Sequence, residues 1–168
     1  LHHLDHPTVG WRVLRDRLRP GGVMLVGLYS RLARESIVEA QRESRRYPPT
    51  REGIRAARDH LRRLPHGHPA HAGTGLRDFY YTSGCRDLLM HPREHLFTIP
   101  DIARTLEQLD LRFLGFDVDP AVRRRHRILF GRTGVLSDWE QFERLYPETF
   151  LGMYQFWVQR PERSTLDE

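Results

Sequence analysis

The architecture of this chain follows from one short run of residues, Pro20-Gly21-Gly22-Val23-Met24-Leu25-Val26-Gly27-Leu28-Tyr29. Its first three residues predict a tight turn, since proline and glycine end helices and permit sharp changes of chain direction. The residues after the turn are nearly all apolar and do not alternate with polar ones. Such a run is typical of a strand in a parallel sheet that helices cover on both faces. We therefore expect a strand over residues 23–29 that is buried on both sides.

Apolar residues recur at helical spacing both before and after this strand. The stripe that precedes it consists of Trp11, Leu14 and Leu18. The stripes that follow it are Ala33, Ile37 and Ala40, and then Ile54, Ala57, Leu61 and Leu64. Two prolines at 48–49 separate the last two helices, and a loop or disordered tip is expected over residues 65–75.

The final third of the chain predicts further helices and strands. Thr98 and Asp101 have the spacing of a capping box, and a second such box begins at Ser137. Apolar side chains alternate over residues 111–118, and an aromatic strand is expected over residues 153–158. Helices alternate with strands along the sequence, which indicates an α/β fold.

The composition is that of a globular protein. Of the 168 residues, 39% are hydrophobic and 29% are charged, which suits one domain with a sizeable core. No apolar run reaches the roughly 18–20 residues of a membrane-spanning helix, and a single cysteine, Cys85, excludes an internal disulfide. We expect a cytoplasmic protein without membrane association. Because the chain begins at Leu1, within an ordered motif, we also expect it to be a piece of a longer protein.

The net charge of +5 comes from arginine, since lysine is absent. A basic surface can bind nucleic acid or an acidic ligand, but solvated arginine-rich helices give the same composition, and we favour that interpretation. The run Arg123–Arg127 is interpreted in the same way, against the alternative of phosphate contacts. His66, His68 and His71 lie close in sequence, but their Gly/Pro-rich setting has no acid to orient the rings, so no metal site is expected.

Several motifs, taken in order, carry a resemblance to a known family. They include Leu1-His2-His3-Leu4-Asp5-His6-Pro7 and Leu18-Arg19-Pro20-Gly21-Gly22. These resemble the loop after the fourth strand, and the entry into the fifth, of class I S-adenosylmethionine-dependent methyltransferases. Residues 111–116 and 154–158 look like the sixth and seventh strands of that family. Gly27-Leu28-Tyr29-Ser30-x-x-Ala33-Arg34 and Cys85-Arg86-Asp87-Leu88-Leu89-x-His91 are similar to a bacterial subgroup that is often joined to tetratricopeptide repeats.

The resemblance implies that this chain is the C-terminal half of a Rossmann-like methyltransferase sheet. It would contain strands resembling the fifth, seventh and sixth, the last one antiparallel, with helices on both faces and a helical insertion. Residues 1–168 would be a partial methyltransferase domain, and residues 48–97 a helical and loop insertion resembling an acceptor lid. The first three strands would lie upstream of Leu1.

The cofactor implied for the full-length protein is S-adenosylmethionine. The family holds it with a glycine-rich turn after the first strand and an acidic residue at the end of the second. Neither is present in this sequence. Gly73-Thr74-Gly75 is the nearest similar stretch, but no strand is expected before it. The isolated chain is therefore expected to be inactive and to bind the cofactor negligibly.

The resemblance also implies which residues form the site. Cofactor contacts are expected from Leu1, His2 and His3. Acceptor contacts are expected from His3, Tyr29, Ser30, Arg34, Tyr80, Arg86 and Asp87. Each residue has an alternative structural role, namely loop packing, a last core position in a strand, a solvated helical arginine, or an internal Arg–Asp network. No general base is assigned, although the imidazole of His3 offers a group that can orient the acceptor or accept its proton.

The expected function is transfer of a methyl group to an unidentified nucleophile on a small molecule or a protein. A non-catalytic α/β module that binds a protein partner is the alternative, since it would have the same architecture. A tetratricopeptide-repeat region upstream is a further element that the resemblance implies.

Overall fold

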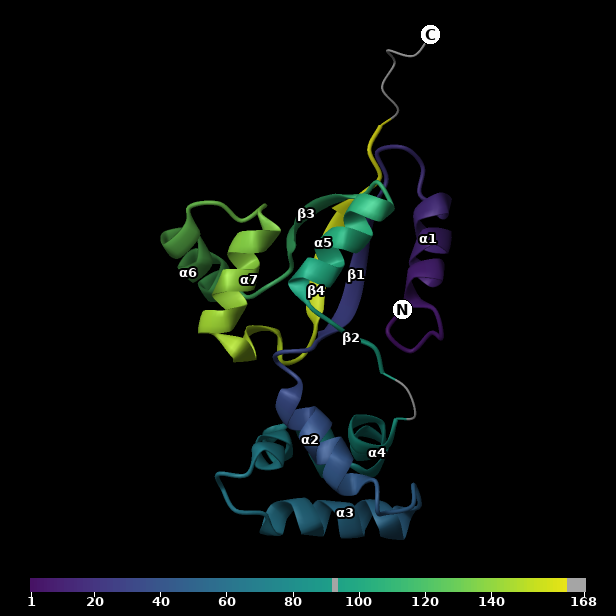
Figure 1. Cartoon of the computed structure of the whole chain (residues 1–168), viewed down its shortest axis with the longest axis vertical. Helices are drawn as coiled ribbons and strands as arrows, with labels where there is room; N and C mark the ends of the chain where they lie inside the picture. The colour runs from purple at the N-terminus through teal and green to yellow at the C-terminus, as the bar shows by residue number, and fades with distance from the viewer. Residues whose placement is uncertain (92–93, 163–168) are drawn as a thin grey trace. The chain divides into compact units, whose positions relative to one another are not determined.

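The computed structural model describes residues 1–91 and 94–162, without the side chain of Ala72 (Figure 1). The chain divides into two compact units. Unit 1 combines Leu1–Ala33 with the chain from His95 onward, and unit 2 is Arg34–Glu94. The expected insertion over residues 48–97 therefore overlaps unit 2 for most of its length. Among the described residues, no helix has both the length and the hydrophobicity needed to cross a bilayer.

Unit 1 is built on a four-stranded mixed sheet with the strand order β2-β1-β4-β3. The strands are β1 (Val23–Ser30), β2 (Leu96–Phe97), β3 (Arg112–Phe116) and β4 (Tyr154–Gln159). Strand β4 lies between β1 and β3 and is antiparallel to both. Strand β2 runs parallel to β1 and pairs with only its last two residues, Tyr29 and Ser30. The expected α/β class is confirmed, and the three strands expected from sequence are present.

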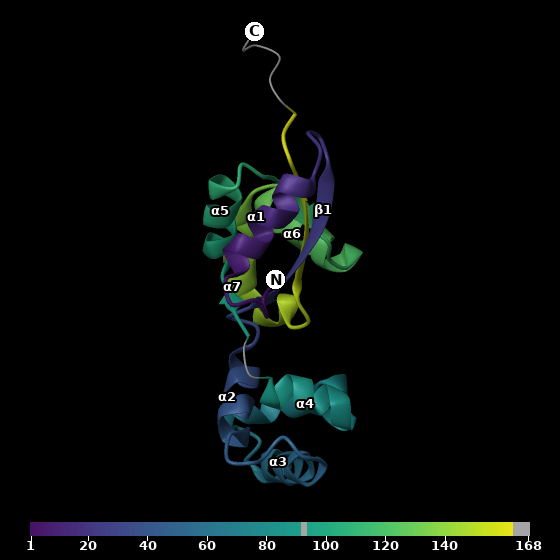
Figure 2. The same ribbon diagram turned by 90° about the vertical axis from the view of Figure 1, so that its right-hand side faces the viewer.

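Helices pack against one face of this sheet. They are α1 (Pro7–Arg17), α5 (Ile99–Gln108) and α7 (Leu136–Leu145), followed by the 3₁₀ turn Pro147–Phe150, while α6 (Pro120–Phe130) packs on α7 through His126, which stacks on Trp139. The core joins Trp11 of α1, Ile102 of α5 and Trp139 of α7 to the inward side chains of β1 and β4. In Figure 2, α1 and α5 lie on the same side of β1. This layer of buried aromatic and aliphatic side chains is the main source of stability, because burial of apolar area contributes about 25 cal/mol per Å².

The other face of the sheet is open, so the expectation of helices on both faces is wrong for the described part of unit 1. Val23, Leu25 and Trp157 are 49%, 46% and 41% exposed, and Leu25 pairs across the strands with Trp157. Burial instead alternates along β1, with Val26 and Leu28 facing the core. The apolar run therefore predicted the strand correctly, but the prediction that helices cover both faces of that strand was wrong.

Helix α1 also differs from the expected pattern. Trp11 is buried, but Leu14, which was expected on the same buried stripe, is exposed, as are Val9 and Val13. A single large side chain therefore anchors α1, and its remaining apolar residues face outward.

Unit 2 is helical and has its own core. Its elements are α2 (Glu35–Ser44), α3 (Arg51–Arg63), the 3₁₀ helices Pro69–Gly75 and Arg77–Tyr80, and α4 (Thr82–Met90). The side chains of Ile37, Leu61 and Phe79 are fully buried. The expected loop or disordered tip over residues 65–75 is largely an ordered 3₁₀ helix, in which Ala70 is buried.

Candidate functional site

Two histidines and a tyrosine meet at the carboxyl end of β1. The ring of His2 lies 4.2 Å from the rings of both His3 and Tyr29, measured between centroids, and His3 lies 6.1 Å from Tyr29. The Nδ1 atom of His2 is 3.3 Å from the carbonyl oxygen of Gly27, which fixes the orientation of that ring. Thus three of the residues expected at the site come together, and we call them the His2–His3–Tyr29 cluster.

The backbone at the start of the chain explains this placement. The amide of Leu4 donates to the carbonyl of Leu1 at 3.0 Å, which forms a turn, and the amide of His95 donates to the carbonyl of His2 at 2.8 Å. The side chain of Leu1 packs against the hydrophobic core. Leu1 therefore anchors the turn, and the two histidines project from it, half-buried at His2 and exposed at His3.

Ser30 has a different environment from its neighbour Tyr29. Its side chain is fully buried, its Oγ donates to Glu143 at 2.5 Å, and it accepts from the amide of Ala33 at 3.0 Å. Because both interactions lie inside unit 1, the hydroxyl stabilises the end of β1 and does not face a ligand in this structure.

Glu143 is a buried acid that the sequence did not reveal. The hydroxyl of Tyr154 lies 2.7 Å from both of its carboxylate oxygens, and Ser30 contributes the other hydrogen bond. Burial raises the pKa of Glu143, although these hydrogen bonds act in the opposite direction. Burial, followed by the nearby Glu143 carboxylate, also raises the pKa of Tyr154. The available signal was spacing, since Glu143 follows the core residue Trp139 by one helical turn.

Arg34 lies in unit 2, where it forms a buried ion pair. One guanidinium nitrogen is 3.2 Å from Glu94, and the two side chains are only 6% and 9% exposed. Gln41 donates to the same carboxylate at 3.1 Å and to the carbonyl of Leu88 at 2.9 Å. The sequence predicts a contact between Arg34 and the acceptor. In this structure the guanidinium of Arg34 instead pairs with Glu94 and links the start of α2 to the end of unit 2.

Arg86 and Asp87 line an open hollow of about 520 Å³ within unit 2. The other lining residues come from the starts of α3 and α4; they are Pro49, Arg51, Ile54, Thr82 and Ser83. Tyr80, also expected to contact the acceptor, does not line this hollow. It is 60% exposed, and the guanidinium of Arg62 lies 5.9 Å from its ring. The expected acceptor residues of unit 2 are therefore only partly brought together.

Within the described residues, His66, His68 and His71 of unit 2 do not form a metal site. The rings of His66 and His71 are 4.7 Å apart, and Nδ1 of His68 accepts from the amide of Ala70 at 3.2 Å. In the described part of the chain, these three side chains do not bring their ligand atoms within the spacing that one metal ion requires.

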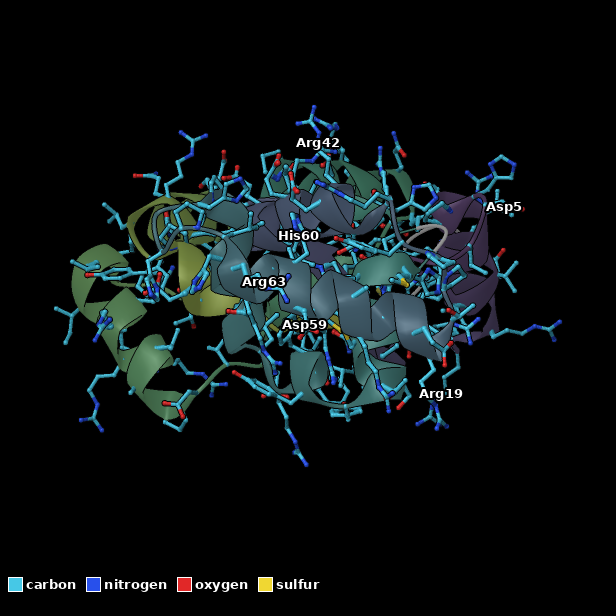
Figure 3. All side chains as sticks on the ribbon, turned by 90° about the horizontal axis from the view of Figure 1, so that it is seen from below. Asp5, Arg19, Arg42, Asp59, His60 and Arg63 are labelled. Atoms are coloured by element: carbon cyan, nitrogen blue, oxygen red, sulfur yellow. The ribbon has the colours of Figure 1, made fainter. Side chains whose placement is uncertain are left out.

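The arginine side chains are spread over the surface. Figure 3 shows the long side chains of Arg19 and Arg42 extending outward from the ribbon of their own units. In α6, His126 is buried and stacks on Trp139 at 3.8 Å, whereas the neighbouring arginines are exposed. Burial lowers the pKa of His126, so this histidine belongs to the core and not to a basic binding surface.

Comparison with known proteins adds one relative. No protein-family model matches the chain. It is similar to the uncharacterized protein syc1184_c of Synechococcus sp., with 27% identity over 183 aligned positions. The alignment covers 95% of this chain and 42% of the relative, so the chain spans about two fifths of the length of the curated protein it matches.

Proposed function

We propose that this chain is the C-terminal, acceptor-side part of a class I S-adenosylmethionine-dependent methyltransferase that modifies an unidentified nucleophile. The observation that carries the proposal is the position of β4, antiparallel between β1 and β3. The order β1-β4-β3 agrees with the fifth, seventh and sixth strands that the motif resemblance implies. A last strand that inserts between two earlier ones is a specific topology, and it supports the proposal more strongly than the Pro-Gly-Gly turn alone.

The surfaces that unit 1 leaves open support a larger sheet. In the described residues, β1 has no partner along Val23–Leu28 on the side away from β4, because β2 pairs only with Tyr29 and Ser30. An unpaired edge with an exposed apolar face beside it is a liability that proteins normally cover. Further strands and helices from a longer protein would cover both, in agreement with the 42% coverage of the relative.

The residues present fit only one part of a methyltransferase site. Gly73-Thr74-Gly75 belongs to a 3₁₀ helix of unit 2 and does not follow a strand, so it is not the turn that holds this cofactor. The acid that takes the cofactor's ribose belongs to the second strand of the family, which the resemblance places upstream of Leu1. The glycine-rich turn and the ribose acid would therefore come from residues outside this chain, and Leu1, His2 and His3 would contribute the remaining contacts to the cofactor.

The acceptor would bind at the His2–His3–Tyr29 cluster. Ligands of open α/β sheets bind beyond the carboxyl ends of the strands, which is where this cluster lies. The rings of His2 and Tyr29 form an aromatic wall, and the exposed imidazole of His3 orients the acceptor. Positioning of the acceptor in this way supplies much of the acceleration of a transfer reaction.

The test uses the chain extended upstream in its own gene. The extended protein is expected to bind S-adenosylmethionine with micromolar affinity by calorimetry and to transfer methyl groups to members of a screen of small acids, amines and peptides. His3→Ala should lower turnover at least tenfold, while the exposed control Arg123→Ala leaves it unchanged. An extended protein without cofactor binding would contradict the proposal and favour the protein-interaction module. Micromolar binding to residues 1–168 alone would show that the cofactor pocket has been assigned to the wrong part of the protein.

A further inference from the structure

Unit 1 contains a polar pocket that the proposed methyltransferase site does not use. Its volume is about 330 Å³, and it lies where α1, β2 and α5 meet the end of β1. The residues that line it include Arg31, His95, Asp101 and Arg104. Its lining is thus rich in charged and hydrogen-bonding side chains.

Two arginines give the pocket an excess of positive charge. Arg31 follows β1 directly, its amide donates to the carbonyl of Phe97 at 2.8 Å, and its guanidinium donates to the carbonyl of Leu96 at 3.3 Å. The backbone around Arg31 is therefore fixed against β2. Arginine carries five N–H donors, and the bond to Leu96 uses one of them.

The acid in the pocket is already engaged. One oxygen of Asp101 accepts hydrogen bonds from the amide and the hydroxyl of Thr98, at 2.8 and 2.6 Å. Its other oxygen forms an ion pair with Arg104. Burial raises the pKa of Asp101, but the hydrogen bonds from Thr98 and the charges of Arg104 and Arg31 outweigh it and leave the pKa lowered. The carboxylate therefore stays ionised and neutralises one of the two arginines.

His95 adds a further polar group. Its backbone amide is bonded to the carbonyl of His2, which connects this pocket to the start of the chain. Its Nε2 atom is buried and has no hydrogen-bond partner among the described residues. A buried polar atom without a partner costs about 1–3 kcal/mol, so a ligand that supplied the partner would remove that cost.

We propose that this pocket binds a small oxyanion, a carboxylate or a phosphate, between Arg31, Arg104 and His95. Guanidinium groups recognise both anions through paired, charge-assisted hydrogen bonds. The pocket volume suits an anion with a small organic group attached, since ligand sites begin at roughly 300 Å³. The proposal stands on this pocket alone and does not depend on methyl transfer.

The test is a titration of the chain, with Leu25→Lys introduced to oppose self-association through the exposed strand, followed by the NMR signals of the arginine Nε–H groups. One arm uses inorganic phosphate and the other uses acetate, each at an ionic strength held constant with sodium chloride. We expect at least one of the two anions to shift the signals of Arg31 and Arg104 with a saturable curve. Shifts with phosphate alone would identify the ligand as a phosphate, and shifts with acetate alone would identify it as a carboxylate. Shifts with both would show that the pocket binds either group.

Two substitutions with opposite expected effects on the affinity for the oxyanion distinguish binding in the pocket from a general effect of salt. Arg31→Gln should weaken binding at least tenfold, which is 1.4 kcal/mol, and Arg123→Gln, on the exposed surface of α6, should leave it unchanged. Asp101→Asn removes the competing negative charge and keeps an oxygen that can cap α5, so it should tighten binding several-fold. Equal effects of chloride and the oxyanions, or weaker binding in Asp101→Asn, would overturn the proposal.

Discussion

Glu143 is the residue whose environment departs furthest from what its chemical type indicates. It belongs to a helix that is otherwise anchored by aromatic side chains, and its two hydrogen-bond donors in the described part of the chain are hydroxyls, those of Ser30 and Tyr154. A buried acid held by neutral donors is stabilised less than one paired with a cation. The ionised form of Glu143 is therefore the costly one in the folded protein.

This cost predicts how stability depends on pH. Because burial raises the pKa of Glu143, its protonated form favours folding. The stabilisation is fully present below the ordinary pKa of 4.5 and is lost as pH rises through the folded value. Relative to Glu143→Gln, the free energy of unfolding of the natural protein should therefore fall as pH rises above about 4.5.

Urea unfolding followed by tryptophan fluorescence measures this difference, because Trp11, Trp139 and Trp157 all lie in unit 1. Glu140→Gln, on the same helix but paired with Arg144 at the surface, is the matched control; it keeps Glu143 and should therefore show the same fall with pH as the natural protein. Parallel stability curves for the natural protein and Glu143→Gln would refute the argument.

At the scale of the elements, the sequence predicts what local interactions decide. The capping box at Thr98 is confirmed, since its side chain accepts from the amide of Asp101 at 3.2 Å. The box expected at Ser137 is wrong, because α7 begins at Leu136 after an uncapped Val135. Strand β2 was not predicted, since two residues carry no periodic pattern and their pairing depends on β1.

In the candidate site, too, the sequence predicts some contacts but not the hydrogen bonds between distant residues. His2, His3 and Tyr29 could be expected to meet, because both stretches were interpreted as strand ends on one edge of a sheet. The bond between Ser30 and Glu143 joins residues 113 positions apart and has no local signal. The engagement of Arg34 by Glu94, across 60 positions, is of the same kind. Long-range polar partners are therefore what the sequence could not supply.

The Arg34–Glu94 pair predicts a test of how unit 2 is held together. Arg34→Met would leave the Glu94 carboxylate buried without its cation, which typically costs roughly 3–5 kcal/mol. Amide hydrogen exchange over α2 and α4 should accelerate accordingly, while α5 in unit 1 keeps its protection. Adding Glu94→Gln to Arg34→Met should restore most of the protection, because no buried charge then remains. Unchanged exchange in Arg34→Met would assign Arg34 to ligand binding instead of internal support.

For the whole molecule, the unequal covering of the sheet has the largest consequence. One face of unit 1 holds the aromatic core, whereas the opposite face exposes Val23, Leu25 and Trp157 beside the open edge of β1. Exposed apolar surface next to unpaired strand backbone favours association with another chain. The exposed apolar face and the open edge of β1, which support the proposal of a longer protein, therefore also predict that residues 1–168 associate with one another when produced alone.

We expect this chain, produced alone, to self-associate in sedimentation experiments at micromolar concentrations. Leu25→Lys should shift it toward the monomer, because a charge on an exposed strand opposes edge-to-edge pairing. Its free energy of unfolding should change by no more than about 0.5 kcal/mol, since the side chain is not in the core. Ile128→Lys, at a still more exposed apolar position on α6, should leave self-association unaltered, and Leu28→Lys should unfold unit 1. A natural chain that sediments as a single monomeric species would show that the open face and edge need no partner, and would remove the main physical support for a larger sheet.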